Sequence, residues 1–334
     1  MAPAAPRVTF AMQRYLFPCM VLAVALLAAA SLFIGVSEVS VLDVLTGRAD
    51  AAALEILAVS RLPRTLSLLL AGAAMAVAGL LMQMLARNRF VEPSTAGTVE
   101  SASLGLLVVL IFAPALPVMG KMLVASLFAL AGTALFMAIL SRIPHRSTLV
   151  VPLVGIMLGG VINAGTTFFA YRYDLMQSLG AWTMGDFSGV LRGRYELLWL
   201  ALALTVAAYV AADRFTVAGL GRSFTTNLGL HYGRVLALGL TIVSLVTAVV
   251  VVTVGSIPFL GLIVPNLVSM AIGDNVRRGL PWVALTGALF VLVCDIVGRT
   301  IRAPYEVPLG TIVGVLGSGP VSYTHLRAHE TRED

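Results

Sequence analysis

The sequence predicts an all-α, polytopic membrane protein with about ten transmembrane helices. Hydrophobic residues fill 59% of its 334 positions and charged residues only 11%. Its mean hydropathy is +0.97. Soluble domains carry roughly 25% charged residues, so this composition cannot cover a water-exposed surface. Apolar runs separated by short polar segments recur along the whole chain, and a bilayer core of about 30 Å accepts helices of about 20 such residues.

The apolar runs give the expected spans in chain order. The first is too long for the apolar part of a secretory signal peptide, and no small-residue cleavage site followed by a soluble domain comes after it. Several runs are shorter than 20 residues, which a crowded or tilted bundle tolerates. The expected spans are 15–34, 65–85, 102–112, 122–140, 149–170, 197–212, 235–254, 259–272, 280–297 and 307 to the end of the native chain.

Basic residues give a weak orientation signal. An even number of spans puts both termini on one side, and the loops on that side hold slightly more Lys and Arg than the opposite loops. Loops rich in Lys and Arg stay in the cytoplasm, which favours cytoplasmic termini. The sequence pI is about 9.7, but the basic residues come singly or in pairs. That pattern fits membrane lipid headgroups better than nucleic acid.

Several kinds of chemistry are missing from the sequence. Cys19 and Cys294 both lie in apolar runs, so neither a disulfide framework nor a cysteine metal site is expected. We find no catalytic triad pattern, paired carboxylates or metal-ligand cluster, and expect no metal and no other cofactor. The nucleotide-binding pattern G-x-x-x-x-G-K-[ST] is also absent. The sequence therefore favours a transport subunit over an enzyme.

Three arginines are candidates for a docking surface at the outer helix ends. Arg61 and Arg64 flank Pro63, which fixes the chain where a helix begins, and their spacing puts both on one face. Arg299 follows Asp295 by four residues, the spacing of an ion pair within a helix. A lone arginine at such a place usually extends to lipid headgroups. Together, the three could form a basic rim that binds carboxylates of an acidic soluble partner.

A long polar insertion, residues 213–234, follows the sixth expected span. Its glycines bracket a short segment in which Ser223 and Thr225 are acceptable N-cap residues. This pattern predicts a short helix-turn-helix at the membrane surface that serves as an interaction platform. The plainer alternative is an ordinary connecting loop, although about twenty residues exceed most connections.

The fifth expected span carries polar residues that could line a transport path, namely Asn163, Thr166 and Thr167. A rival class is the ion-coupled secondary transporter, which needs ionisable residues at mid-membrane depth. The expected spans hold almost none between their ends. A membrane scaffold without transport activity is a third alternative, but it leaves the long insertion without a role.

Four segments in chain order carry a family resemblance. They are Arg61-Leu-Pro-Arg-Thr-Leu, residues 71–83, residues 255–266 with Gly-Ser-Ile-Pro-Phe-Leu-Gly-Leu-Ile-Val-Pro-Asn, and residues 307–314. With these segments, residues 10–321 resemble the FecCD-type permease subunit of type II ABC importers, which take up ferric siderophores, haem and cobalamin.

The resemblance implies a ten-helix permease domain over residues 1–321, in the bacterial inner membrane with both termini cytoplasmic. It implies a second permease subunit, identical or paralogous, with the transport path between the two. Two separate ABC ATPase subunits would hydrolyse the ATP. A periplasmic or lipoprotein substrate-binding protein would deliver the cargo.

The resemblance also assigns roles to residues at the two membrane surfaces. The arginines Arg61, Arg64 and Arg299 match those that engage acidic residues of the substrate-binding protein. The insertion 213–234 matches the coupling helices that contact the ATPase. Its expected contact residues are Gly219, Gly221, Arg222, Ser223, Thr226, Leu228, Gly229 and Leu230.

A cytoplasmic gate is implied at Asn88 and Phe90 after the second span, and at Thr148 and Leu149 before the fifth. Many members read Asn-Pro-Leu-Ala-(Asp/Glu)-Pro-Gly at the first of these places, whereas this chain reads Asn-Arg-Phe-Val-Glu-Pro-Ser from Asn88. That variant looks like the subgroup for catecholate-type siderophores such as anguibactin, vibriobactin or petrobactin. We therefore expect a ferric siderophore as cargo, with haem or cobalamin as alternatives.

The end of the chain departs from the family. The family continues apolar after Val321, whereas residues 322–334 are polar. Residues 307–321 reach only about 22 Å as a helix, short of the bilayer core. We expect a truncated last helix followed by a disordered, non-native tail, in which His325 and His329 form no metal site.

Overall fold

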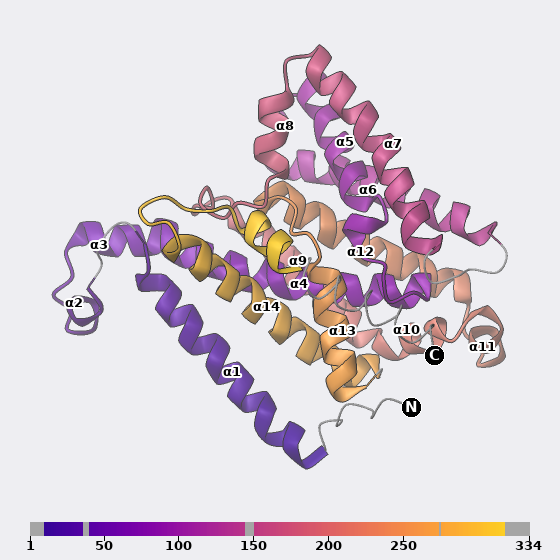
Figure 1. The fold of residues 1–334 in the computed structure, drawn as a ribbon, viewed down its shortest axis with the longest axis horizontal. Coiled ribbons are helices and arrows are strands. Elements are labelled where there is room, and N and C mark those ends of the chain that lie inside the picture. Colours follow the sequence, from indigo (N-terminus) through magenta and orange to yellow (C-terminus); the bar gives the residue numbers. More distant parts are fainter. Residues whose placement is uncertain (1–9, 36–39, 144–149, 274, 318–334) are drawn as a thin grey trace, which may run out of the picture.

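The computed structural model describes residues 10–35, 40–143, 150–273 and 275–317, and these are built from helices and connections without strands (Figure 1). The gate candidates Thr148 and Leu149 and the tail 322–334 lie outside the described residues. The helices are α1 Phe10–Phe33, α2 Val41–Leu45, α3 Ala51–Ile56, α4 Leu62–Ala86, α5 Thr98–Phe112, α6 Val118–Ser141, α7 Val150–Arg172, α8 Met176–Thr183, α9 Leu198–Val210, α10 Ala212–Gly219, α11 Arg222–Asn227, α12 Tyr232–Val254, α13 Leu260–Ile272 and α14 Val276–Thr300.

The all-α membrane class is confirmed, but the count of about ten spans is not. Six of the described helical segments are long and apolar enough to cross a membrane, and a seventh is the pair α9 and α10, which bends by 64° at its junction. Helices α5 and α13 were expected to span, but they have 15 and 13 residues. At 1.5 Å per residue they reach about 22 and 20 Å. Residues 309–317 begin a further helix where the description ends.

Helix α4 is the centre of the bundle. It packs against α9, α12, α13 and α14, and most of its side chains are buried. Two glycine pairs allow this closeness. A methyl group on Gly72 would lie 2.7 Å from the carbonyl oxygen of Gly287 in α14, and one on Gly79 would lie 2.2 Å from the Cα of Gly261 in α13. Small residues let helix backbones touch where apolar burial gives no drive toward association in lipid.

The other helices extend the bundle on two sides of this centre. Helix α1 packs along the outer side of α14, and α5 to α8 form a group that joins the rest through α12 (Figure 1). On α7, Ile156, Met157, Val161 and Phe168 are exposed in the isolated chain. Such an apolar face fits lipid or a partner helix within the membrane.

Candidate functional site

The two predicted interaction surfaces lie at opposite ends of α4. Arg64 stands in the first turn of this 25-residue helix and Arg87 caps its other end, about 35 Å away at 1.5 Å per residue. The polar insertion lies at the Arg87 end, because a methyl group on Gly219 would meet Met84 and one on Gly221 would meet the guanidinium of Arg87. Figure 1 shows the same separation, with α10 and α11 far from α2 and α3.

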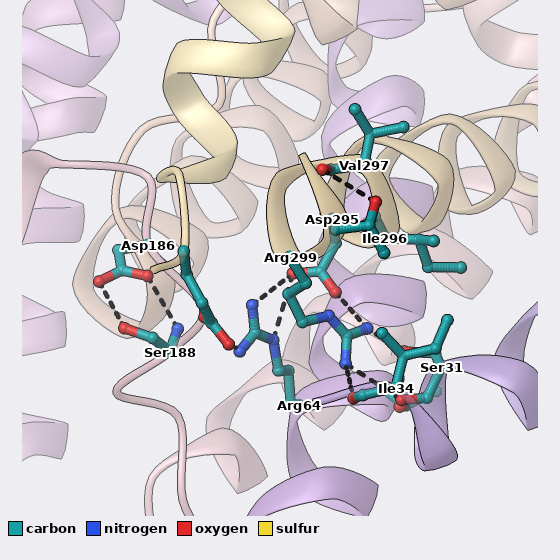
Figure 2. A network of polar contacts seen from close by, with 12 residues as sticks. Ser31, Ile34, Arg64, Asp186, Ser188, Asp295, Ile296, Val297 and Arg299 are labelled. Carbon is teal, nitrogen blue, oxygen red and sulfur yellow. Dashed lines mark hydrogen bonds and ion pairs between the residues drawn. The ribbon is translucent and has the colours of Figure 1, made fainter. Parts of the chain in front are cut away.

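Asp295 joins two of the candidate arginines at the Arg64 end of α4. Its Oδ1 accepts hydrogen bonds from Arg64 Nε at 3.2 Å and from Arg64 NH2 at 2.7 Å. Its Oδ2 lies 2.5 Å from NH2 of Arg299, one turn further along α14 (Figure 2). The ion pair expected from the spacing of Asp295 and Arg299 is therefore confirmed. Arg64 comes from α4, so the carboxylate also joins the two helices.

The same cluster holds the end of α1. Arg299 NH1 donates to the carbonyl oxygens of Ser31 and Ile34 at 3.1 and 2.8 Å, and its NH2 donates to Ser31 Oγ at 2.5 Å. Arg61 NH1 donates to the carbonyl oxygen of Leu32 at 3.2 Å. Carbonyl groups in the last turn of a helix have no partner within the helix, and cations there are stabilised by the helix dipole. The arginines thus cap α1.

This cluster is largely internal, whereas the sequence suggested a basic rim. Arg61 and Arg299 are each 7% exposed. The Arg64 side chain is 13% exposed, and its NH1 forms an ion pair of 2.8 Å with Glu306, whose side chain is 28% exposed. The docking role of the three arginines stays a prediction. A carboxylate of a partner protein would have to compete with Glu306 for the guanidinium group of Arg64. Nothing in the local sequence marks Glu306 as the partner of Arg64, 242 residues away.

The two gate candidates that the structure describes, Asn88 and Phe90, lie in the segment between α4 and α5, residues 87–97, which we name the gate segment. Arg87 ends α4 in the left-handed conformation with φ 53°. Asn88 is buried, and its Oδ1 accepts a hydrogen bond from the Phe90 backbone at 2.8 Å, which forms a turn typical of Asn. Phe90 is 41% exposed. The turn thus brings a buried amide and an exposed aromatic ring close together.

Glu92 anchors the middle of the gate segment. Its side chain is 1% exposed, and its Oε1 accepts hydrogen bonds from Ser94 Oγ and, at 2.9 Å, from the backbone N–H of Phe259. Burial raises the pKa of Glu92 to about 7, although hydrogen bonds from Ser94 and from the start of α13 lower it. An acceptor oxygen faces Phe259 in both protonation states. Sequence reasoning gave Glu92 no role.

The polar insertion lies at the same end of α4 as the gate segment. It forms two short helices, as the sequence predicted. Helix α10 ends at Gly219, and α11 starts after Gly221, whose φ of 113° suits glycine. The prediction that Ser223 or Thr225 caps α11 is wrong. Both stand inside it, and Thr225 Oγ1 bonds back to the Gly221 carbonyl at 2.8 Å.

The end of α11 follows from its glycine. Gly229 has φ +77°, and its N–H donates to Thr226 O while that of Leu230 donates to Thr225 O, both at 3.0 Å. This is the Schellman pattern that ends a helix at a left-handed glycine. The resulting surface is apolar. Leu220, Phe224 and Leu228, spaced four residues apart, are 56%, 59% and 62% exposed.

The path candidates on α7 separate into two sets. Asn163 and Thr167 are exposed and one turn apart, whereas Thr166 is buried and bonds to the carbonyl of Ile162 at 2.8 Å. Beside them, the Glu100 carboxyl group lies where a methyl group on Gly159 would meet it at 3.3 Å. Glu100 belongs to α5, which corresponds to the third expected span. That span was expected to begin at residue 102, but α5 starts at Thr98. Glu100 is therefore an ionisable helical residue that the prediction missed.

A cavity of about 360 Å³ lies at the Arg87 end of α4, next to the gate segment and α10. It lies between α4, α13 and α14, and its walls include Asn88 of the gate segment, Gly219 of α10 and Asn266 of α13. Asn266 Nδ2 donates to the Arg89 carbonyl at 2.9 Å. The gate segment, α10 and α13 therefore all line the same cavity.

Comparison with known proteins gives consistent matches. The sequence matches the FecCD transport family over residues 21–327. It is 51% identical over 315 residues to the petrobactin import system permease protein YclN of Bacillus subtilis, covering 94% of this chain and 98% of that protein. It is 41% identical over 298 residues to the ferric-anguibactin transport system permease protein FatD of Vibrio anguillarum, covering 89% of this chain and 94% of that protein.

A solved structure gives a match of the fold. It is described as an inward-facing conformation of a metal-chelate type ABC transporter, with a TM-score of 0.80 and 24% sequence identity. The match covers 94% of this chain and 99% of that chain.

Proposed function

Since the chain belongs to the FecCD transport family, we propose that it is the permease subunit of an ATP-driven ABC importer that carries a ferric siderophore across the bacterial inner membrane. The observation that carries this proposal is the 51% identity to a petrobactin import permease over 94% of the chain. The iron chelate is the cargo, and this subunit supplies a path and a gate without bond-making chemistry. ATP hydrolysis belongs to a separate subunit, since the sequence has no G-x-x-x-x-G-K-[ST] pattern.

A siderophore is the cargo that the relatives favour. YclN is named as a petrobactin permease and FatD of Vibrio anguillarum as a ferric-anguibactin permease. The sequence Asn88-Arg-Phe-Val-Glu-Pro-Ser resembles the same subgroup. A catecholate-type ferric siderophore therefore takes precedence over haem and cobalamin.

The partners we propose fit the two ends of α4. At the inward end, the exposed stripe Leu220, Phe224 and Leu228 on α10 and α11 would lie against an ATPase subunit, one for each of two permease subunits. At the outward end, Arg64 is the arginine open enough for a carboxylate of the substrate-binding protein. The apolar face of α7, with Asn163 and Thr167, would face the second permease subunit and the path.

The topology we propose has ten spans and both termini in the cytoplasm. The short helices α5 and α13 and the helix that begins at residue 309 would be the three spans beyond the seven recognised by length. Short helices are tolerated when their ends lie within protein, since no backbone group then faces lipid unpaired.

Uptake by the assembled importer tests this function. The permease would be co-expressed with the ATPase and the substrate-binding protein, placed in proteoliposomes, and supplied with radioactive iron bound to petrobactin. We expect iron to enter only when ATP, the ATPase and the binding protein are all present. Uptake without the ATPase, or driven by an ion gradient alone, would contradict the proposal.

The variant Arg64→Glu tests the docking end. It replaces a cation with an anion beside Asp295 and Glu306 and is expected to abolish binding-protein docking. Arg302→Glu is the matched control, because Arg302 lies at the same end and is exposed. Docking measured on immobilised complexes that is equal for both variants would remove Arg64 from the interface.

A further inference from the structure

We propose that Glu92 is a positioning residue of the gate, whose carboxyl group ties the gate segment to the start of α13 so that the two move as one body. This inference rests on the proposed function, since it takes residues 87–97 as the part that opens and closes. It adds a residue and a mechanical connection to that function.

The first observation is that Glu92 joins two distant parts of the chain. Its Oε1 lies 2.9 Å from the backbone nitrogen of Phe259, 167 residues away. A methyl group on Gly261 would lie 3.1 Å from Glu92 Oε2. Both carboxyl oxygens therefore face the first turn of α13, where backbone N–H groups have no partner within the helix. The buried carboxyl group accepts the hydrogen bond of one of them, the Phe259 N–H, from outside the helix.

The second observation is that the gate segment holds Glu92 firmly. The Glu92 N–H donates to Thr95 Oγ1 at 3.0 Å, and Thr95 Oγ1 donates to the Glu92 carbonyl at 3.2 Å. Ser94 Oγ donates to the carboxyl group itself. Backbone and side chain are thus fixed to the same short turn, so a displacement of the carboxyl group displaces the turn.

The third observation is a second attachment on the other side of Phe90. Asn266 Nδ2 of α13 donates to the Arg89 carbonyl at 2.9 Å. With Glu92 at one point and Arg89 at another, the exposed Phe90 stands between two bonds to the same helix. Two hydrogen bonds fix the orientation of the gate segment relative to α13, whereas a single bond would let the segment rotate about it.

These bonds connect the gate to the proposed ATPase end. Helix α13 and Gly219 of α10 line the same cavity, and the backbones of α13 and α4 touch at Gly261 and Gly79. Helix α10 packs against α4 and α14, and both of these pack against α13, so a shift of α10 would reach α13 through them and Glu92 would pass it to the gate segment. Without the carboxyl group, α13 could move while the gate stays behind.

The test compares Glu92→Ala, Glu92→Gln and Ser94→Ala in the full importer in proteoliposomes. Gln keeps an oxygen acceptor for the Phe259 N–H, and Ala removes it. Ser94→Ala tests the other attachment of the carboxyl group, because Ser94 bonds to the same carboxyl group from the gate segment and not from α13. We expect Glu92→Ala to lower iron uptake per ATP hydrolysed roughly tenfold, as the loss of a buried hydrogen-bond acceptor implies. Glu92→Gln should stay near the parent ratio, and Ser94→Ala, which removes one of the three bonds that fix Glu92 to its turn, should fall between Glu92→Gln and Glu92→Ala.

Hydrogen exchange supplies a readout that does not depend on the cargo. In the assembled complex, Glu92→Ala should speed amide exchange in residues 87–97 and 259–263 together, whereas Glu92→Gln should not. Faster exchange in one segment alone, or equal losses in the Ala and Gln variants, would overturn the inference. If the Ala variant fails to assemble, Glu92→Asp, whose shorter side chain cannot reach Phe259 in the same pose, should give the same paired change.

Absence of iron-siderophore uptake by the parent protein would contradict the proposed function and leave the exchange result as the measure of the inference. Normal uptake together with unchanged exchange in Glu92→Ala would contradict the inference and leave the function intact. The two failures are therefore separable.

Discussion

The two ends of α4, which the proposed topology places outward at Arg64 and inward at Arg87, are built on different physical principles. At the outward end, Arg64, Arg299, Asp295 and Glu306 neutralise one another inside the protein. At the inward end, carboxyl and amide side chains bind backbone groups, and the exposed surface is an apolar stripe. These charged groups at the outward end are therefore paired within the chain, whereas the inward end exposes Leu220, Phe224 and Leu228 side by side with its polar contacts.

This difference indicates how each end can respond to a partner. A binding protein at the outward end must replace an existing ion pair, so its net gain is small and reversible. A partner at the inward end gains the burial of apolar area without breaking a bond in this chain. Transient docking outside and permanent attachment inside are what an importer with a soluble cargo carrier requires.

Breaking the outward cluster should give the largest effect. Asp295→Asn removes the charge between Arg64 and Arg299 and leaves two buried guanidinium groups short of compensation. Loss of one partner from a buried ion pair costs about 3–5 kcal/mol. We expect a clear drop in the midpoint of thermal unfolding in detergent.

Asp213→Asn is the control for this comparison. It breaks the ion pair of Asp213 with Arg277, whose side chains are 64% and 59% exposed, and exposed pairs contribute little. Similar unfolding midpoints for both variants would mean that the buried cluster adds no more than a surface pair.

Removing the apolar stripe at the inward end should have the second-largest effect, on assembly and not on folding. Phe224 is 59% exposed, so Phe224→Ser should leave the unfolding midpoint unchanged. Truncating an aromatic anchor at a protein interface costs about 2 kcal/mol or more. We expect the ATPase to be lost during co-purification.

Thr216→Ala serves as the comparison, since Thr216 lies on the neighbouring helix α10, outside the expected contact residues, and its hydroxyl bonds locally to the Ala212 carbonyl at 2.9 Å. The ATPase should stay bound to this variant. Full retention by Phe224→Ser as well would show that the stripe is not the contact surface.

Sequence reasoning succeeded where the physical signal is local. Runs of apolar residues predicted α4 as 65–85 against Leu62–Ala86 and α12 as 235–254 against Tyr232–Val254. The pairing of Asp295 with Arg299 followed from helical spacing alone. The lipid environment requires long continuous helices, so composition is nearly sufficient for the longest ones.

The signals that failed are those that depend on long-range contact. Hydropathy gave α5 and α13 as short runs, 102–112 and 259–272, but it could not show that α5 begins at Thr98 or that Glu92 contacts the start of α13. Arg64 and Glu306 are 242 residues apart in the sequence. A count of charges in the loops therefore could not show that these two side chains form an ion pair. Burial of Arg61 and Arg299 follows from the end of α1 lying against them, which no spacing within their own helices reveals.

The smallest predicted effect sharpens the outward side of the comparison. Glu306→Gln removes the charge that occupies Arg64 NH1 at 2.8 Å while keeping the shape of the side chain. Because Glu306 is partly exposed, its pair with Arg64 contributes at most about 1 kcal/mol, and a competing carboxylate from the binding protein would gain that amount. Binding-protein affinity, measured on the complex in nanodiscs, should rise a few-fold, with a steeper loss at high salt than in the parent. Weaker binding would instead mean that Glu306 holds Arg64 in the orientation that the partner needs, and that the internal pair is part of the docking surface.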